Sequence, residues 1–157
     1  MKLVEFSPDR VRHIARNMRA DDRAEVHATR WDDDDDRLAA EVCAYPTKLR
    51  WVACHGDEPV AVIGAVNMWP GNFSVFMFAT DNIQHIGLSL TRFAKYRMIP
   101  TLLDMGGWRG EARSAAFHTE AHRWLEALGA RRESTLANYG KNGEDFYNYV
   151  WTRPDVS

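Results

Sequence analysis

Three residues that could bind a phosphate group lie close together in the middle of the chain. They form the pattern Gln84-x-x-Gly87-x-Ser89, after a strand-like run at 73–79 and at the start of a segment with helical apolar spacing. The first N–H groups of a helix lack partners within the helix and carry partial positive charge. A glycine leaves room for an anion there, so the pattern predicts a phosphate-binding strand–turn–helix junction. The alternative is an amphipathic helix whose glycine only permits close packing.

Two further groups of residues could bind metal ions. His118 and His122 are four residues apart, as two zinc ligands on one helix face can be. No third ligand is evident, so we expect an ordinary pair on the helix surface and no metal. The five aspartates Asp32 to Asp36 lack the glycine and the ligand spacing of a calcium loop. We expect a solvated loop that ends in helix-capping carboxylates, or else a segment that docks on a basic partner.

The two cysteines, Cys43 and Cys54, have neither metal-site spacing nor a neighbouring base that would mark a nucleophile. The N-terminal residues contain no apolar signal-peptide region, so we expect free thiols in a reducing compartment. A disulfide between the two cysteines remains compatible with the sequence.

The elements that must position these residues follow from periodicity and turn signals. Apolar alternation and turn residues predict three strands joined by short turns, which form an antiparallel meander. Pro100 should end or kink the central helix. Strand 109–117 is needed for the fold although its alanines are poor strand formers. The expected elements are strand 3–6, a helix starting at Ser7-Pro8, helix 21–31, strands 49–54, 59–68 and 73–79, a helix from 84, strand 109–117, helix 119–128 and a hairpin of 131–139 with 145–152.

Two motifs resemble the GNAT family of N-acetyltransferases. The pattern at 84–89 is similar to the family's pyrophosphate-binding signature, which reads Gln or Arg, two residues, Gly, one residue, then Gly or Ala. The segment 118–130 is similar to the family's last helix, with Ala121, Trp124, Leu128 and Gly129 in register. The resemblance implies one α/β (α+β) domain over 1–157, with a mixed, mainly antiparallel, strongly bent sheet and helices on both faces. It also implies acetyl-CoA binding at Gln84, His85, Gly87, Ser89 and His118.

The sequence departs from the family at positions that carry the reaction. Leu125 stands where the family has a proton-donating tyrosine, His118 stands for an asparagine, and Ala130 stands for an aromatic residue. The strand 73–79 carries no acid that could accept a proton from the amine. Catalytic residues are therefore left unassigned. The candidate replacements are Tyr139, Tyr147, Asp81 and His85.

A narrower resemblance links three segments, 78–81, 91–97 and 123–130, to small GNAT-like internal virion proteins of short-tailed bacteriophages. This implies a structural or ejection-associated role in the virion or host cytoplasm, with a degenerate acetyltransferase site. The partners would be other virion proteins or a second copy of the chain. One alternative is an active acetyl-CoA-dependent N-acetyltransferase that acts on a small-molecule or protein amine. Another is an unrelated α/β binding module.

Composition narrows the functional classes. The 157 residues suffice for one core, and the 45% hydrophobic and 27% charged residues are ordinary for a globular chain. A net charge of -2 argues against nucleic-acid binding, and no apolar run is long enough to span a membrane. The six tryptophans are many for this size, and we expect some to serve as surface anchors for a partner.

Overall fold

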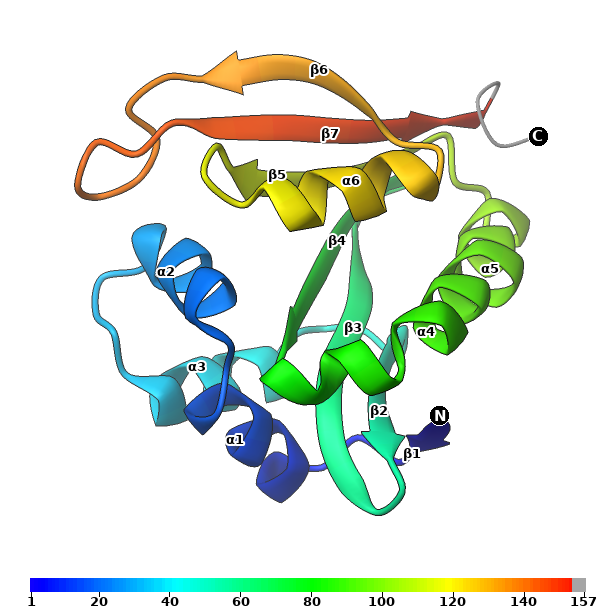
Figure 1. Cartoon of the computed structure of the whole chain (residues 1–157). Coiled ribbons are helices and arrows are strands. Elements are labelled where there is room, and N and C mark those ends of the chain that lie inside the picture. The colour runs from blue at the N-terminus through cyan, green and yellow to red at the C-terminus, as the bar shows by residue number, and fades with distance from the viewer. Residues whose placement is uncertain (154–157) are drawn as a thin grey trace.

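A seven-stranded sheet in the order β1-β2-β3-β4-β5-β7-β6 forms the centre of the computed structural model, which describes residues 1–153 (Figure 1). Neighbouring strands are antiparallel except β4 and β5, which are parallel. The mixed, mainly antiparallel sheet confirms the predicted fold class. The strands are β1 (Lys2–Val4), β2 (Arg50–His55), β3 (Glu58–Trp69), β4 (Asn72–Ala79), β5 (Arg109–Ala115), β6 (Arg131–Leu136) and β7 (Phe146–Thr152).

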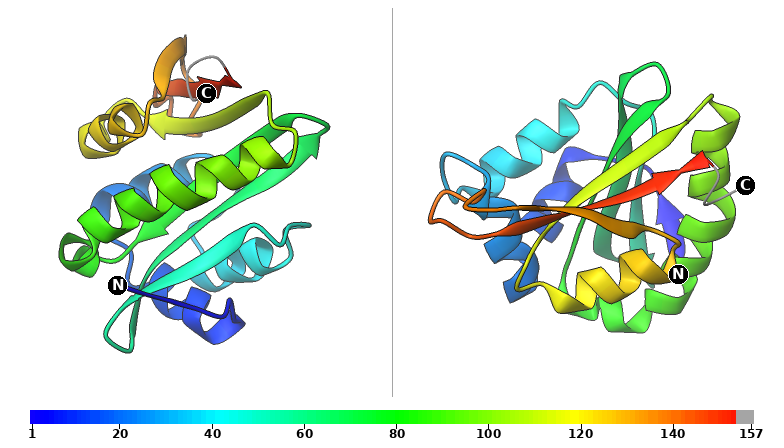
Figure 2. Two further views of the ribbon diagram at one scale, coloured as in Figure 1. Left: turned by 90° about the vertical axis from the view of Figure 1, so that its right-hand side faces the viewer. Right: turned by 90° about the horizontal axis from the view of Figure 1, so that it is seen from above.

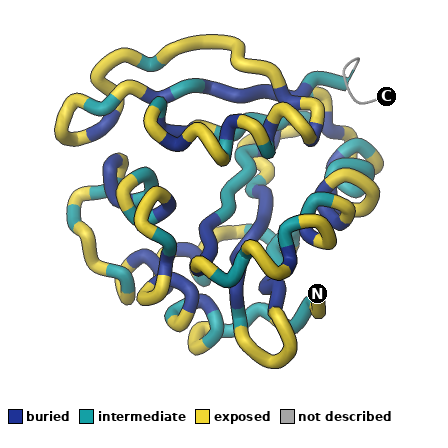
Figure 3. Tube along the Cα trace, viewed as in Figure 1, coloured by how far each residue is buried: buried dark blue, intermediate teal, exposed yellow. Residues whose placement is uncertain are grey.

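Helices cover both faces of the sheet (Figure 2). One face carries α1 (Pro8–Arg16), α2 (Ala20–Ala28) and α3 (Asp35–Cys43), and the other carries the 3-10 helix Asp81–His85, α4 (Gly87–Phe93), the π-helix Ala94–Met98, α5 (Ile99–Asp104) and α6 (Thr119–Ala127). Each face has its own core, centred on Ile14 and Val52 beneath α1 and α3, and on Leu90 and Tyr149 beneath α4 and α6. Figure 3 shows that burial is concentrated in β3 and β7.

Local side-chain signals start the N-terminal helices as predicted. The Ser7 hydroxyl accepts a hydrogen bond from the backbone N–H of Arg10 at 3.4 Å, and Pro8 occupies the first turn of α1. Asp34 caps α3 by accepting from the N–H groups of Asp36 and Arg37 at 2.9 and 3.1 Å. The capping role expected for the aspartate run is thus confirmed.

The rest of the aspartate run forms ion pairs within the chain. The basic partners of these aspartates lie on α1, α2, α3 and the β6–β7 connection, so the run joins elements that are distant in sequence. The pairs are Asp32 with Arg37, Asp33 with Lys141, Asp35 with Arg23 and Asp36 with Arg16, at 2.5–2.8 Å.

The helix that follows β4 differs from expectation at Pro100. Helical structure continues from Gly87 to Asp104 through the π-helical turn 94–98, and Pro100 lies in the first turn of α5. Of the two outcomes expected at Pro100, an end or a kink, the first does not occur: the helix continues past it, because the π-helical turn ahead of it accommodates the missing N–H.

The strand that sequence reasoning found hardest to support, β5, forms through its neighbours. It pairs with β7 over seven residues and with β4 over three. These pairings override the weak strand preference of its alanines. Cys43 and Cys54 are free thiols, as expected, and burial raises the pKa of both. Within residues 1–153, no helix has both the length and the apolar character that crossing a membrane requires.

Candidate functional site

The most distinctive feature of the sheet is the point at which β4 and β5 part. The two strands pair only where Asn72–Ser74 lies beside Arg109–Glu111, with Ser74 opposite Glu111 in the last rung. Beyond that rung they diverge, and Figure 1 shows β4 running away from β5. The backbone N–H and C=O groups of successive residues point to alternate sides of a strand. The Ala79 N–H donates to Asp22 and the Ala79 carbonyl accepts from the Arg19 N–H, so the groups of Ala79 point away from β3, toward the opening. The groups of Met77 therefore face the same opening.

On the side of α4 the opening leads into a cleft of about 330 Å³, here termed the α4-side cleft. Met77 of β4 forms its floor, and Gln84, Gly87 and Leu90 form one wall. Ala121 and Trp124 of α6 form the opposite wall. A Cβ atom added at Gly87 would meet no atom within 4 Å, so the space in front of the first turn of α4 is open. Unpaired N–H groups and an open approach are what an anion needs.

The residues predicted to bind the coenzyme are not all in this cleft. Gln84 and Gly87 line it. His85 is exposed and stacks on His55, with ring centroids 4.8 Å apart. Ser89 is exposed on α4 and does not line this cleft. His118 lines a second cleft, on the opposite side of the opening. The structure thus brings together two of the five residues.

The other side of the opening is a cleft of about 450 Å³, here termed the α2-side cleft. Two edge-to-face aromatic pairs contribute to its lining. They are Tyr45 with Phe76, at a centroid distance of 5.3 Å, and Tyr139 with Phe146, at 5.4 Å. Of the candidate replacement acids, Tyr139 lines this cleft and Asp81 lines the α4-side cleft, whereas Tyr147 and His85 line neither.

Glu111 lines the α2-side cleft at the position where the strands part, and sequence reasoning did not identify it. Its carboxylate accepts a hydrogen bond from Arg109 Nε at 2.8 Å and lies 3.5 Å from Asn148 Nδ2. The hydrogen bonds that Arg109 donates to the carboxylates of Glu133 and Glu111 raise the pKa of Arg109, so Glu111 faces a permanent cation. The period-two alternation of Arg109, Glu111 and Arg113 could have indicated a charged strand face.

A largely buried cluster of four titratable side chains, Arg19, Asp22, Glu25 and His118, links α2 to the separated strand ends. Asp22 accepts the N–H of Ala79, at the end of β4, at 2.7 Å, and pairs with Arg19 at 3.0 Å. Glu25 accepts the N–H of Ala115, at the end of β5, at 2.5 Å. His118 lies between the carboxylates, 3.3 Å from Asp22 and 2.9 Å from Glu25. Two carboxylates of one helix thereby hold the ends of two strands that do not pair there.

The electrostatics of this cluster favour a charged histidine. Burial lowers the pKa of His118, but the hydrogen bond and charge of Glu25 and the charge of Asp22 outweigh it, so the pKa is raised. Burial raises the pKa of Asp22 against the opposing effect of Arg19. The His118 side chain is 2% exposed, and the carboxylates that flank it compensate for its desolvation.

The prediction that His118 and His122 form a surface pair is wrong, because both side chains are buried. His122 Nε2 lies 2.9 Å from the carbonyl oxygen of Ala115, and burial lowers the pKa of this histidine. Asp22 and Glu25 hold the His118 ring inward, and the Ala115 carbonyl holds the His122 ring. Among residues 1–153, no group of three or more side chains is arranged to hold a metal ion.

Trp124 lies between the two clefts and lines both. Its indole N–H donates to the Thr91 hydroxyl at 2.8 Å, which ties α6 to α4. The next residue, Leu125, is 7% exposed and packs in the core, so it supplies no proton donor from α6.

No protein-family model and no curated protein matches the sequence. Solved structures match across almost the whole chain. Ard1 from Thermoplasma volcanium is similar with a TM-score of 0.74 and 13% identity, over 96% of each chain. The ribosomal-protein-S18-alanine N-acetyltransferase from Escherichia coli is similar with a TM-score of 0.69 and 16% identity, over 99% of this chain and 94% of that one.

An aminoglycoside 6'-N-acetyltransferase complexed with coenzyme A also matches, with a TM-score of 0.67 and 16% identity, over 97% of each chain. At these identities the likeness establishes the fold alone. The chain therefore has the fold of the GNAT acetyltransferases.

Proposed function

We propose that the protein is an acetyl-CoA-dependent N-acetyltransferase, with the coenzyme in the α4-side cleft and the acceptor amine in the α2-side cleft. The observation that carries the proposal is the parting of β4 and β5, which joins an open helix N-terminus to a second cleft across the sheet. The proposal is also supported by the aminoglycoside 6'-N-acetyltransferase described above, which has the same fold and was crystallised with coenzyme A.

The α4-side cleft offers two kinds of contact to a coenzyme. The first-turn N–H groups at Gly87 suit the charges of a pyrophosphate, and Gln84 adds a neutral polar side chain beside them. The backbone groups of Met77 face the opening without a strand beside them, so an amide-containing arm can bond there as an added strand would. Together these contacts favour a long ligand with an anionic end and amide groups along its length.

The transfer itself needs few protein groups. The neutral amine attacks the thioester carbonyl, a C–N bond forms, the C–S bond breaks, and coenzyme A leaves as a thiolate. Glu111 lines the α2-side cleft at the last β4–β5 rung and is the carboxylate we assign as acceptor of the amine's proton. A free thiol has a pKa of about 8.5, so a thiolate can leave near neutral pH without a donor at Leu125.

Calorimetric titration with acetyl-CoA tests this proposal. We expect saturable binding to the wild type and its loss in Gly87→Trp, whose indole would fill the phosphate position. Gly87 has an ordinary φ and free space around its Cβ, so the variant should fold normally. Tyr96→Trp is the matched control, because Tyr96 is exposed on the same continuous helix and lines neither cleft. No heat with the wild type at millimolar acetyl-CoA would refute the proposal.

As a second candidate we propose a structural role in a bacteriophage virion, for which the exposed tryptophans offer anchors to a protein partner. Trp31, Trp69 and Trp108 are 103%, 62% and 67% exposed, whereas most tryptophan side chains are largely buried. Such side chains commonly anchor protein–protein interfaces. Mass spectrometry of purified bacteriophage virions tests this role, and absence of the chain from the virions would refute it.

A further inference from the structure

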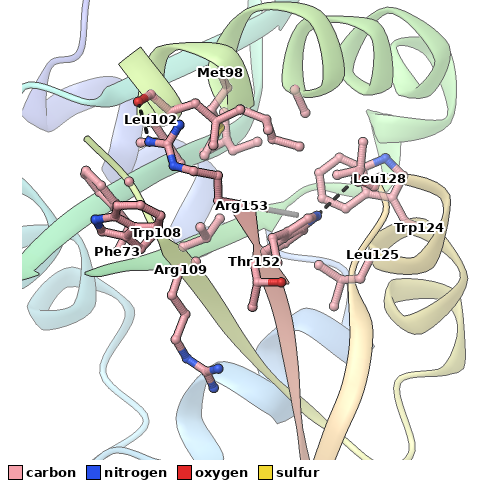
Figure 4. A pocket seen from close by; sticks show the side chains of 18 residues that line it. Phe73, Met98, Leu102, Trp108, Arg109, Trp124, Leu125, Leu128, Thr152 and Arg153 are labelled. Atoms are coloured by element: carbon pink, nitrogen blue, oxygen red, sulfur yellow. Dashed lines mark hydrogen bonds between the residues drawn. The ribbon is translucent and has the colours of Figure 1, made fainter. Parts of the chain in front are cut away.

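An apolar cavity of about 50 Å³ lies between α5 and α6, above the sheet (Figure 4). We term it the α5–α6 cavity. Met98 and Leu102 bound it on one side, and Leu125 and Leu128 of α6 bound it on the other. Phe73 and Val75 of β4 contribute to its base. Arg109 and Arg153 also line the cavity, but their guanidinium groups hydrogen-bond to Glu133 and to the Leu103 carbonyl. The other side chains named here are apolar, so the cavity suits a hydrocarbon group rather than a polar one.

This cavity adjoins both clefts described above. Val75, Trp124 and Leu125 line the α5–α6 cavity and the α2-side cleft, and Trp124 also lines the α4-side cleft. Along β4, side chains two residues apart share a face, so Met77 of the α4-side cleft is followed on that face by Val75 and Phe73 of the cavity. A chain that enters beside Met77 meets the cavity as it reaches the last β4–β5 rung.

We propose that the α5–α6 cavity receives the hydrocarbon tail of an acyl-CoA, so that the preferred donor carries an acyl group longer than acetyl. This inference rests on the proposed acyltransferase function and specifies its substrate class. The carbonyl carbon stays at the meeting point of the clefts, and the tail bends past Trp124 between Val75 and Leu125.

The size of the cavity limits the tail. One water molecule needs on the order of 10–15 Å³ of such space, so about 50 Å³ has room for about three methylene-sized groups. At its outer end Arg153 donates to the carbonyl of Leu103 at 3.1 Å and lies over the Trp108 ring at 4.9 Å. These contacts close the far side, so a butyryl group fits and a much longer tail does not.

The expected preference follows from burial. Each methylene buried from water strengthens binding about fourfold, so the two extra methylenes of butyryl should tighten binding roughly tenfold to twentyfold over acetyl. Calorimetric titration of the full chain with CoA, acetyl-CoA, butyryl-CoA and octanoyl-CoA measures this directly. We expect butyryl-CoA to bind tightest, and octanoyl-CoA to gain nothing further.

Two variants test the location of the tail. Leu102→Trp fills the cavity from α5 and should remove the butyryl preference while leaving acetyl-CoA affinity near wild type. Met98→Ala enlarges the cavity and should shift the optimum to a longer acyl group, so the two substitutions have opposite effects even where both lower stability. Tyr96→Trp is again the control, because its side chain is exposed outside the cavity. Circular dichroism establishes that each variant is folded before titration.

Failure of this inference can be told apart from failure of the proposed function. Equal affinities for acetyl-CoA and butyryl-CoA, or a butyryl preference that survives Leu102→Trp, would overturn the inference and leave the acyltransferase proposal intact. An affinity that keeps rising to octanoyl-CoA would also overturn it, because the tail would then lie outside the cavity. No binding of CoA or of any acyl-CoA would overturn both.

Discussion

Replacing Asp22 by alanine should destabilise the protein strongly, because this one carboxylate satisfies three groups. It is 2% exposed, accepts the Ala79 N–H at 2.7 Å, and lies 3.0 Å from Arg19 and 3.3 Å from His118. The Ala79 amide alone would cost about 1–3 kcal/mol if left unpaired. Removing one partner of a buried ion pair typically costs about 3–5 kcal/mol in total.

We therefore expect Asp22→Ala to lower the free energy of unfolding by about 3–5 kcal/mol. For a chain of this size each kcal/mol lowers the Tm by roughly 2–4 °C, so the fall in Tm should be roughly 6–20 °C. Asp22→Asn keeps an oxygen for the Ala79 N–H and removes only the charge, so its effect should be intermediate.

Urea unfolding at pH 7, followed by tryptophan fluorescence and by circular dichroism, measures these values. The matched control is Asp21→Ala, since Asp21 is exposed on the same helix and carries the same charge. If Asp22→Ala proved no more than about 1 kcal/mol less stable than Asp21→Ala, the cluster would not hold α2 to the strand ends as we infer.

Three further predictions concern pH, catalysis and folding. Because the pKa of His118 is raised in the folded protein, protonated His118 stabilises the fold at low pH, and this stabilisation is lost as the pH rises through that pKa; His118→Gln should therefore flatten the fall in Tm at alkaline pH. The pKa of His122 is lowered, so its contribution to stability is lost as the pH falls, and His122→Gln should flatten the fall in Tm at acid pH. Profiles of Tm against pH that match the wild type would contradict both expectations. Glu111→Gln should lower kcat about 10²–10⁴-fold with a partial recovery at alkaline pH, and an unchanged kcat would exclude Glu111 as the base. Asp34→Ala should cost about 0.5–2 kcal/mol in urea unfolding through loss of the α3 cap, whereas Asp33→Ala should stay near wild type; equal effects would refute the capping role.

Local signals in the sequence predicted most elements of the fold. The Ser7-Pro8 start of α1, the aspartate cap of α3 and the meander of β2, β3 and β4 depend on neighbouring residues, and all are present. Gly87 likewise lies at the start of α4, because a strand, a turn and an apolar period of 3.6 residues place it there.

The site could be predicted only in part, because its remaining parts depend on distant contacts. Asp22 and Glu25 meet His118 across more than 90 residues, and no spacing in the sequence reports that approach. Glu111 lies in a strand that forms by pairing with β7 and β4 against its own propensity. The burial of His118 and His122 has the same origin, since the carbonyl and carboxylates that hold them belong to β5 and α2.

A crystal structure of the protein grown with acetyl-CoA tests the central claim most directly. We expect density for the coenzyme between β4 and β5, with its pyrophosphate at the N–H groups of Gly87 and its thioester beside Ser74 and Glu111. Density elsewhere on the molecule, or an empty opening at saturating acetyl-CoA, would contradict it.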